Sequence, residues 1–185
     1  LALVPPAGRV VGFDRGGDLL ERFVARAVEL GVDHEAVQGD WPADAAKVGP
    51  ADVVVCHHVA YNVADLAAFA AELGRHARRR VVMELTSEHP RTGMNHLWRH
   101  FWDLDRPSGP TADDAVALLV DAGIRPAVER IPRIPRPVTR AVRVASARRY
   151  LCLTEDRDPE IDALLGEESE LAGEMVTLWW DVAAI

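Results

Sequence analysis

A short run of apolar, mostly β-branched residues at positions 51–56 constrains the fold of this chain most strongly. The run reads Ala-Asp-Val-Val-Val-Cys and contains a single polar residue. Strands of this composition are buried on both faces, and that environment is typical of parallel sheets whose faces are covered by helices. Residues 51–56 therefore predict a buried strand of an α/β fold.

Further strand-like segments alternate with segments of helical periodicity. Strands are expected at 10–13, 34–38, 51–56, 80–85, 125–131 and 175–182, and helices within 19–28, 63–73, 111–123 and 139–165. Thr111 and Asp114 have the spacing of a capping box at a helix start, and Gly123 has the position of a helix end. Because right-handed crossovers place each helix against the sheet, the order predicts a mostly parallel sheet with helices on both faces.

Length, charge and cysteine content narrow the class of protein further. The 185 residues fit one domain, 1–185, and no apolar run has the roughly 18 residues that a membrane span requires. The net charge of -8 argues against nucleic acid as the partner, although residues 125–149 hold eight arginines and one acid. We interpret that arginine-rich segment as either facing the acidic segment 155–174 or lying on a solvated surface. The two cysteines form no disulfide or metal pattern, and we expect a cytoplasmic protein that does not bind membranes.

Polar residues follow three consecutive expected strands. Asp14 ends the first strand, Asp40 ends the second, and Cys56, His57 and His58 end the third. Ligands of such sheets bind at the carboxyl ends of the strands, so we expect these residues to open into one crevice. A carboxylate there can accept hydrogen bonds from ribose hydroxyls or from an exocyclic amine, but each acid could equally be an ordinary turn residue.

The order of these segments resembles the class I, Rossmann-like S-adenosylmethionine-dependent methyltransferases. Residues 10–14 (Val-Val-Gly-Phe-Asp), 38–41 (Gln-Gly-Asp-Trp) and 52–61 look like successive motifs of that family. The resemblance implies an antiparallel C-terminal hairpin formed by 125–131 and 175–182. It also implies a cofactor, S-adenosyl-L-methionine, and a methyl transfer to an O, N or C atom of a small-molecule acceptor.

The resemblance assigns cofactor-binding roles to seven residues. They are Asp14, Arg15, Gly39, Asp40, Trp41, Cys56 and His57. Asp14 would hold the ribose, Asp40 and Trp41 the adenine, and Cys56 and His57 would present backbone near the methionine portion. The family's glycine-rich loop follows an earlier strand, and residues 1–8 look instead like the end of a helix. We therefore expect a further βα unit ahead of residue 1.

Three residues are candidates to accept a proton from the methyl acceptor. They are His58, Tyr61, which the resemblance places near the transferred methyl group, and His96. A general base is optional, because alignment and exclusion of water can supply most of the acceleration. His96 and His100 have a spacing that could bind a metal, but no third ligand is evident, so no metal is expected.

Residues 86–110 form a long connection rich in aromatic and histidine residues. Such insertions often serve as lids or acceptor walls, although Leu97, Trp98, Phe101 and Trp102 could equally be the buried stripe of a short amphipathic helix. Trp179 and Trp180 are expected to point to opposite faces of a strand, so one of them could contact a partner subunit in a homodimer or a lid. A nicotinamide-dependent oxidoreductase and a noncatalytic nucleotide-binding protein of the same fold are the alternative functions.

Overall fold

The computed structural model describes residues 6–133, 138–166 and 173–182. Its strands are β1 (Arg9–Asp14), β2 (Asp33–Gln38), β3 (Ala51–His57), β4 (Ala77–Thr86), β5 (Ala127–Pro132) and β6 (Glu174–Asp181). Its helices are α1 (Gly17–Glu29), α2 (Leu66–His76), α3 (Asn95–Trp102), α4 (Ala112–Asp121), α5 (Arg140–Tyr150) and α6 (Asp158–Leu164). Each strand and helix expected from the sequence is present, with shifted ends. None of the described helices combines the length and the apolar character needed to cross a bilayer.

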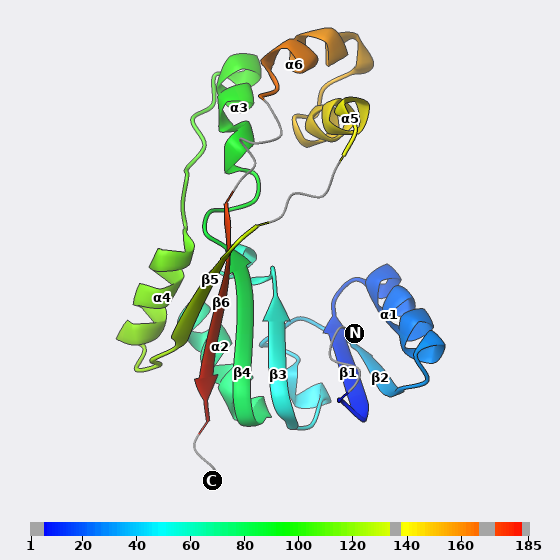
Figure 1. Ribbon diagram of the computed structural model, residues 1–185, viewed down its shortest axis with the longest axis vertical. Coiled ribbons are helices and arrows are strands. Elements are labelled where there is room, and N and C mark those ends of the chain that lie inside the picture. Colours follow the sequence, from blue (N-terminus) through cyan, green and yellow to red (C-terminus); the bar gives the residue numbers. More distant parts are fainter. Residues whose placement is uncertain (1–5, 134–137, 167–172, 183–185) are drawn as a thin grey trace.

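The strands form two sheets. β1 pairs with β2 in parallel, and β3 pairs with β4 in parallel. β6 runs antiparallel between β4 and β5, so the larger sheet has the order β3-β4-β6-β5. These pairings confirm the mostly parallel α/β fold and the antiparallel C-terminal hairpin. In the described ranges β1 and β3 share no hydrogen-bonded ladder, although β1 is the strand of the small sheet that lies nearer to β3 (Figure 1).

Local capping fixes where α4 begins and ends. The Thr111 side chain accepts a hydrogen bond from the backbone N–H of Asp114, and the Asp114 carboxylate accepts one from the backbone N–H of Thr111. Just beyond the helix, Gly123 has a φ of +83°, a left-handed conformation that favours glycine. The capping box predicted from the sequence is therefore confirmed.

The main hydrophobic core lies between one face of the larger sheet and the helices α2 and α4. Its most deeply buried sheet residues are Val81, Met83, Leu85, Val176 and Leu178. Full burial of each such side chain contributes about 1.5–3 kcal/mol, so this interface dominates the stability of the sheet. Leu66, Phe69, Ala70 and Leu73 of α2 and Ala112, Ala115 and Leu119 of α4 cover it.

The opposite face of β3 is exposed. Val53 and Val55 retain 44% and 40% of their accessible surface, and side chains two apart on a strand share a face. Among the described helices, α2 and α4 lie behind the larger sheet and none lies in front of it (Figure 1). The composition of residues 51–56 predicted a strand buried on both faces. Within the described residues β3 is buried on one face only.

Three helices form a separate helical cap beyond the carboxyl ends of β4 and β5 (Figure 1). We use the term helical cap for α3, α5 and α6. Their shared core contains Leu97, Val144, Ala147, Leu151 and Ile161. Trp98 and Phe101 pack against this core, whereas Trp102 is 46% exposed. Residues 95–102 are thus an amphipathic helix, which was one of the two readings of the 86–110 segment.

Candidate functional site

The carboxyl ends of β1 and β2 bring two acids to neighbouring positions. The backbone N–H of Gly39 donates to the carbonyl of Asp14 at 3.1 Å. Arg15, directly after Asp14, has its Nη1 3.9 Å from Oδ1 of Asp40. Asp14 and Asp40 therefore lie at one edge of the small sheet, as the sequence predicted.

The two carboxylates differ in how much of their hydrogen-bonding capacity is free. Asp14 Oδ1 accepts from the backbone N–H of Gly16 at 2.7 Å, which forms the turn into α1. Within the described residues Asp14 Oδ2 accepts no hydrogen bond. The Asp40 side chain is 69% exposed, with Arg15 as its ion-pair partner. Both acids can accept further hydrogen bonds from a ligand.

The loop after β2 is shaped around Gly39. A Cβ at this position would lie 2.8 Å from Cζ of Phe13 and 2.8 Å from Cβ of Asp44, so only glycine fits without rearrangement. Asp44 Oδ2 accepts the backbone N–H of Asp40 at 2.9 Å. That hydrogen bond, with a second one from Lys47, lowers the pKa of the Asp44 carboxyl. Asp44 therefore stays ionised and holds the loop that carries Asp40.

Trp41 connects the small sheet to α2. Its ring meets Phe13 edge to face at 5.4 Å and His76 at 4.9 Å between centroids. Its Nε1 donates to the carbonyl of Phe69 at 3.5 Å. The indole is partly buried in the main core. Trp41 thus has a packing role that the sequence did not reveal, beside the adenine contact that the family resemblance implies.

The carboxyl ends of β3 and β4 gather two histidines around one acid. Oε1 of Glu84 lies 3.8 Å from Nδ1 of His57 and 3.6 Å from Nε2 of His58. His58 has a φ of +57°, an uncommon conformation for a non-glycine residue, and its N–H donates to the carbonyl of Glu84 at 2.9 Å. Backbone conformations of this kind are concentrated at functional sites.

Tyr61 lies beside this group. Its hydroxyl is 2.7 Å from Oγ1 of Thr86 and also accepts the backbone N–H of Thr86. Its ring stacks on His58 at 6.4 Å and meets His89 edge to face at 5.3 Å. The structure therefore brings together two of the three proposed proton acceptors, His58 and Tyr61.

His96, the third proposed proton acceptor, lies in the helical cap. Its Nε2 is 3.1 Å from the carbonyl of Leu164, and it makes no hydrogen bond or ring contact with His58 or Tyr61. His100, one turn further along α3, has its Nε2 2.6 Å from Oε1 of Glu160. In the described part of the chain, no group of three or more His, Cys, Asp and Glu side chains is arranged to hold a metal ion.

Cys56 is buried at the end of β3. Burial raises the pKa of its thiol to about 12, although a hydrogen bond with the backbone of Val59 opposes the shift. The thiol is therefore protonated near neutral pH and is not a nucleophile. Any contact of this residue with a ligand would come from its backbone, as the resemblance implies.

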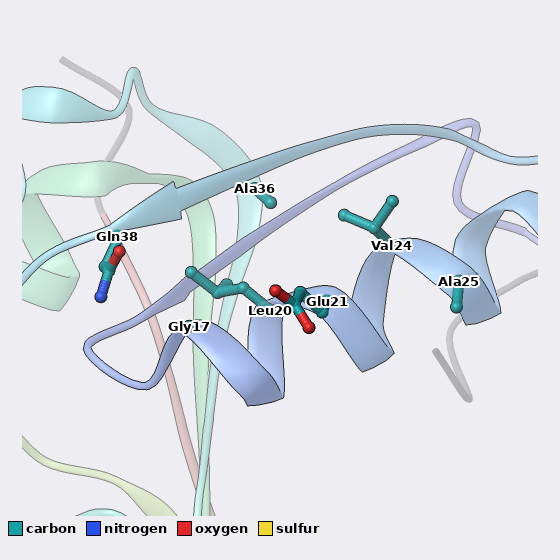
Figure 2. A pocket seen from close by; sticks show the side chains of 7 residues that line it. All are labelled: Gly17, Leu20, Glu21, Val24, Ala25, Ala36 and Gln38. Atoms are coloured by element: carbon teal, nitrogen blue, oxygen red, sulfur yellow. The ribbon is translucent and has the colours of Figure 1, made fainter.

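A separate hollow lies between α1 and β2 (Figure 2). Gly17, Leu20 and Val24 of α1 and Ala36 and Gln38 of β2 line it, together with Glu21 and Ala25. Neither Asp14 nor Asp40 contributes to its lining. This hollow is mostly apolar and reaches the strand ends only at Gly17 and Gln38, so we do not assign it to the candidate site.

This chain resembles known proteins in structure rather than in sequence. No family model matches it, and no curated protein matches it. A candidate methyltransferase from Bacillus halodurans superposes with a TM-score of 0.59 at 17% identity, over 97% of this chain and 85% of that one. Magnesium protoporphyrin IX methyltransferase from Synechocystis gives 0.58 at 14% identity, over 98% and 68%.

This chain has the class I methyltransferase fold. A third structure of the same fold, a SAM-dependent methyltransferase from Thiobacillus denitrificans in complex with S-adenosylhomocysteine, has a TM-score of 0.51 at 18% identity over 92% of this chain and 75% of that one. The Synechocystis enzyme was also crystallised with S-adenosylhomocysteine. The fold expected from the order of motifs is therefore confirmed.

Three residues of the site were not assigned a role from the sequence. They are Glu84, Thr86 and His89. Glu84 is the one acid in the otherwise apolar 81–85 segment of its strand. An acid in such a segment indicates a functional residue, so Glu84 could have been predicted from the sequence. Thr86 and His89 have no such signal, because their importance comes from contacts with Tyr61, 25 and 28 positions earlier.

Proposed function

We propose that this chain is an S-adenosylmethionine-dependent methyltransferase. The observation that carries the proposal is the pair of acids, Asp14 and Asp40, at adjacent strand ends of a fold whose solved examples include complexes with S-adenosylhomocysteine. The alternative of a nicotinamide-dependent enzyme has no comparable support. A likeness of fold alone does not fix the chemistry, so the donor groups of the site must bear the argument.

The donor set fits an adenosine. Asp14 has one carboxylate oxygen free for the ribose hydroxyls, and the exposed carboxylate of Asp40 can accept from an exocyclic amine. Arg15 keeps Asp40 at this edge, and Gly39 allows the loop to pass close to Phe13. Trp41 offers ring surface beside Asp40. When bound, the cofactor supplies an electrophilic methyl group on a sulfonium.

The neighbouring strand ends would receive the methyl acceptor. Cys56 and His57 would present backbone near the methionine portion of the cofactor, and beside them Tyr61 is fixed by its two hydrogen bonds to Thr86. A fixed side chain aligns an acceptor with little entropic loss on reaction. His58 can take a proton from a hydroxyl or amine, and the Glu84 carboxylate orients and stabilises the imidazolium that results. We propose that the methyl acceptor is a small molecule.

A further βα unit would complete the cofactor site. Two features of the fold favour this prediction: β1 and β3 each have one hydrogen-bonded neighbour in the described ranges, and the front of β3 exposes Val53 and Val55. One parallel strand between β1 and β3 would pair both edges, and its helix would cover the valines. Hydrogen exchange tests this prediction, because β4 protects only the β3 amides that point toward it, and slow exchange of the other β3 amides requires a second partner strand.

Calorimetry of S-adenosylhomocysteine binding tests the proposed function. Asp14→Ala removes a charged hydrogen-bond acceptor and should weaken binding by about 10- to 100-fold. The matched control is Asp33→Ala, which removes an acid from the amino end of the same strand pair and should bind normally. Absence of binding by the full protein, or tight binding of NADH in its place, would contradict the proposal.

A further inference from the structure

The guanidinium groups of two arginines lie over aromatic rings where the helical cap meets the segment after β4. Cζ of Arg91 is 4.4 Å from the centre of the Tyr150 ring. Cζ of Arg106 is 5.0 Å from the centre of the Trp98 ring and 5.7 Å from that of Tyr150. The two rings meet edge to face at 5.6 Å. We call these four residues the arginine–aromatic cluster.

No carboxylate of the described residues neutralises the positive charges of this cluster. Neither Arg91 nor Arg106 has a carboxylate within 4.0 Å in the described ranges. Glu88, an acid in the same segment, accepts instead from the hydroxyl of Thr92 at 3.3 Å. Four other arginines of the cap region are paired with acids, namely Arg99 with Asp105, Arg140 with Asp162, Arg148 with Asp158 and Arg157 with Glu160. Arg143 and Arg149 bond instead to the Gly166 carbonyl and the Ser146 hydroxyl.

Other described arginines, Arg22 and Arg79 among them, also lack an ion pair, but Arg91 and Arg106 differ from these in lying over aromatic rings. The net charge is -8, so acids are in excess and partners for a surface arginine are plentiful. The cation–π contacts with Tyr150 and Trp98 restrain both guanidinium groups, whose N–H groups donate no hydrogen bond within the described residues. A planar guanidinium presents parallel N–H donors that match the two oxygens of a carboxylate.

The cluster continues into the candidate acceptor site through His89. Nδ1 of His89 accepts the backbone N–H of Arg91 at 3.2 Å, and its ring meets Tyr61 at 5.3 Å. The pKa of His89 is lowered, first by partial burial and then by the positive charges of Arg91 and Arg106. Both guanidinium groups therefore act electrostatically on a ring that contacts Tyr61.

We propose that Arg91 and Arg106 bind the carboxylate of an aromatic methyl acceptor whose ring lies toward Tyr61 and His89. This assignment of acceptor class rests on the proposed methyltransferase function. Charge complementarity selects an anion, and the adjoining rings of Tyr61, His89 and Tyr150 favour an aromatic body. A nucleic acid is disfavoured because the overall charge of the protein is negative.

Calorimetry with 2-naphthoate and with its neutral amide, 2-naphthamide, tests the proposal. Naphthoate should bind at least tenfold more tightly, and the preference should weaken in high salt. The double variant Arg91→Gln, Arg106→Gln should lose the preference, whereas Arg91→Lys, Arg106→Lys should retain part of it. The matched control is Arg157→Gln, because Arg157 also stacks on a ring, Phe101 at 4.8 Å, but is neutralised by Glu160.

S-adenosylhomocysteine binding, measured on the same variants, separates this proposal from the proposed function. It should be unchanged in both double variants. If the wild type does not bind S-adenosylhomocysteine but still prefers naphthoate to naphthamide, the methyltransferase proposal is contradicted and the anion site is supported. Equal binding of naphthoate and naphthamide, equal weakening by Arg157→Gln, or tighter binding of a single-stranded RNA than of naphthoate overturns the anion site.

Discussion

The hydroxyl of Tyr61 lies 2.7 Å from Oγ1 of Thr86, and this contact joins the segment after β3 to the last residue of β4. The same hydroxyl accepts the backbone N–H of Thr86, which is a buried residue. Two neighbouring strand ends are thereby held in a fixed relation. This phenol oxygen adds to the β3–β4 ladder and to the hydrogen bond from the His58 N–H to the Glu84 carbonyl, which join the same strand ends.

Tyr61→Phe should destabilise the protein by about 1–3 kcal/mol, because a buried N–H of Thr86 would lose its acceptor. Denaturant unfolding at pH 7.5 measures the change. Tyr150→Phe is the matched control: its hydroxyl makes no hydrogen bond in the described residues, so the expected change is under about 0.5 kcal/mol. Equal effects of the two substitutions would rule out the structural role of the Tyr61 hydroxyl.

Trp41→Ala should lower the free energy of unfolding by about 3 kcal/mol. The indole packs against Phe13 of β1 and His76 of α2, so its removal leaves a cavity between the small sheet and the main core. Thermal and urea denaturation measure the loss. Leu104→Ala, at a residue that is 50% exposed, should change stability by less than about 0.5 kcal/mol. A change of that small size for Trp41→Ala would refute the packing role.

The two cysteines should react very differently with a thiol reagent. Cys56 is buried with a thiol pKa of about 12, whereas Cys152 is exposed. The native protein should therefore release one equivalent of thiolate from Ellman's reagent quickly at pH 8, and the second only after unfolding. Cys152→Ser should abolish the fast phase, and Cys56→Ser should retain it. A fast phase of two equivalents would contradict the burial of Cys56.

Stability should decrease as the pH falls just below 6.5, in part because of His89. Its pKa in the folded protein lies below the ordinary value of 6.5, since partial burial and the charges of Arg91 and Arg106 disfavour protonation. Between the two pKa values His89 is protonated more in the unfolded chain than in the folded protein. The free energy of unfolding therefore decreases as the pH is lowered through this window. His89→Asn should reduce this dependence in denaturant titrations at pH 7.5 and 5.5.

The substitution Arg91→Gln tests whether the positive charge of Arg91 lowers the pKa of His89. Removing one positive charge should move the pKa of His89 upward toward its ordinary value, and NMR titration of the imidazole carbon-bound protons follows the shift. Arg75→Gln, on α2, is the matched control and should leave the titration of His89 unchanged. An unchanged His89 titration in Arg91→Gln would exclude the proposed electrostatic link.

Much of the fold was predictable because its signals are local. The alternation of apolar runs with helical periodicity predicted each strand and the order of the α/β elements. The capping box of Thr111 and Asp114 acts over three residues, and the structure contains it as predicted. The acids Asp14 and Asp40 were predicted at adjacent strand ends from the order of strands alone.

The site was predictable only where its residues follow strand ends in sequence. Asp14, Asp40, His58 and Tyr61 do so, whereas the placement of His96 depended on how α3 packs. Because Leu97 is buried against α5 and α6, the helix turns His96 toward the carbonyl of Leu164. The pairing of Glu84 with two histidines likewise required the register of β3 against β4.

The sequence by itself determined the class of fold, the succession of strands and helices, and the acids at the first two strand ends. These depend on residue periodicity and capping, which act within a few residues. Only the tertiary structure decided that Tyr61 bonds to Thr86, that Trp41 joins the small sheet to α2, and that Arg91 and Arg106 stack on the helical cap. Apart from the contact of Arg106 with Trp98, those contacts join residues at least 25 positions apart, so their geometry follows from packing, which no local pattern encodes.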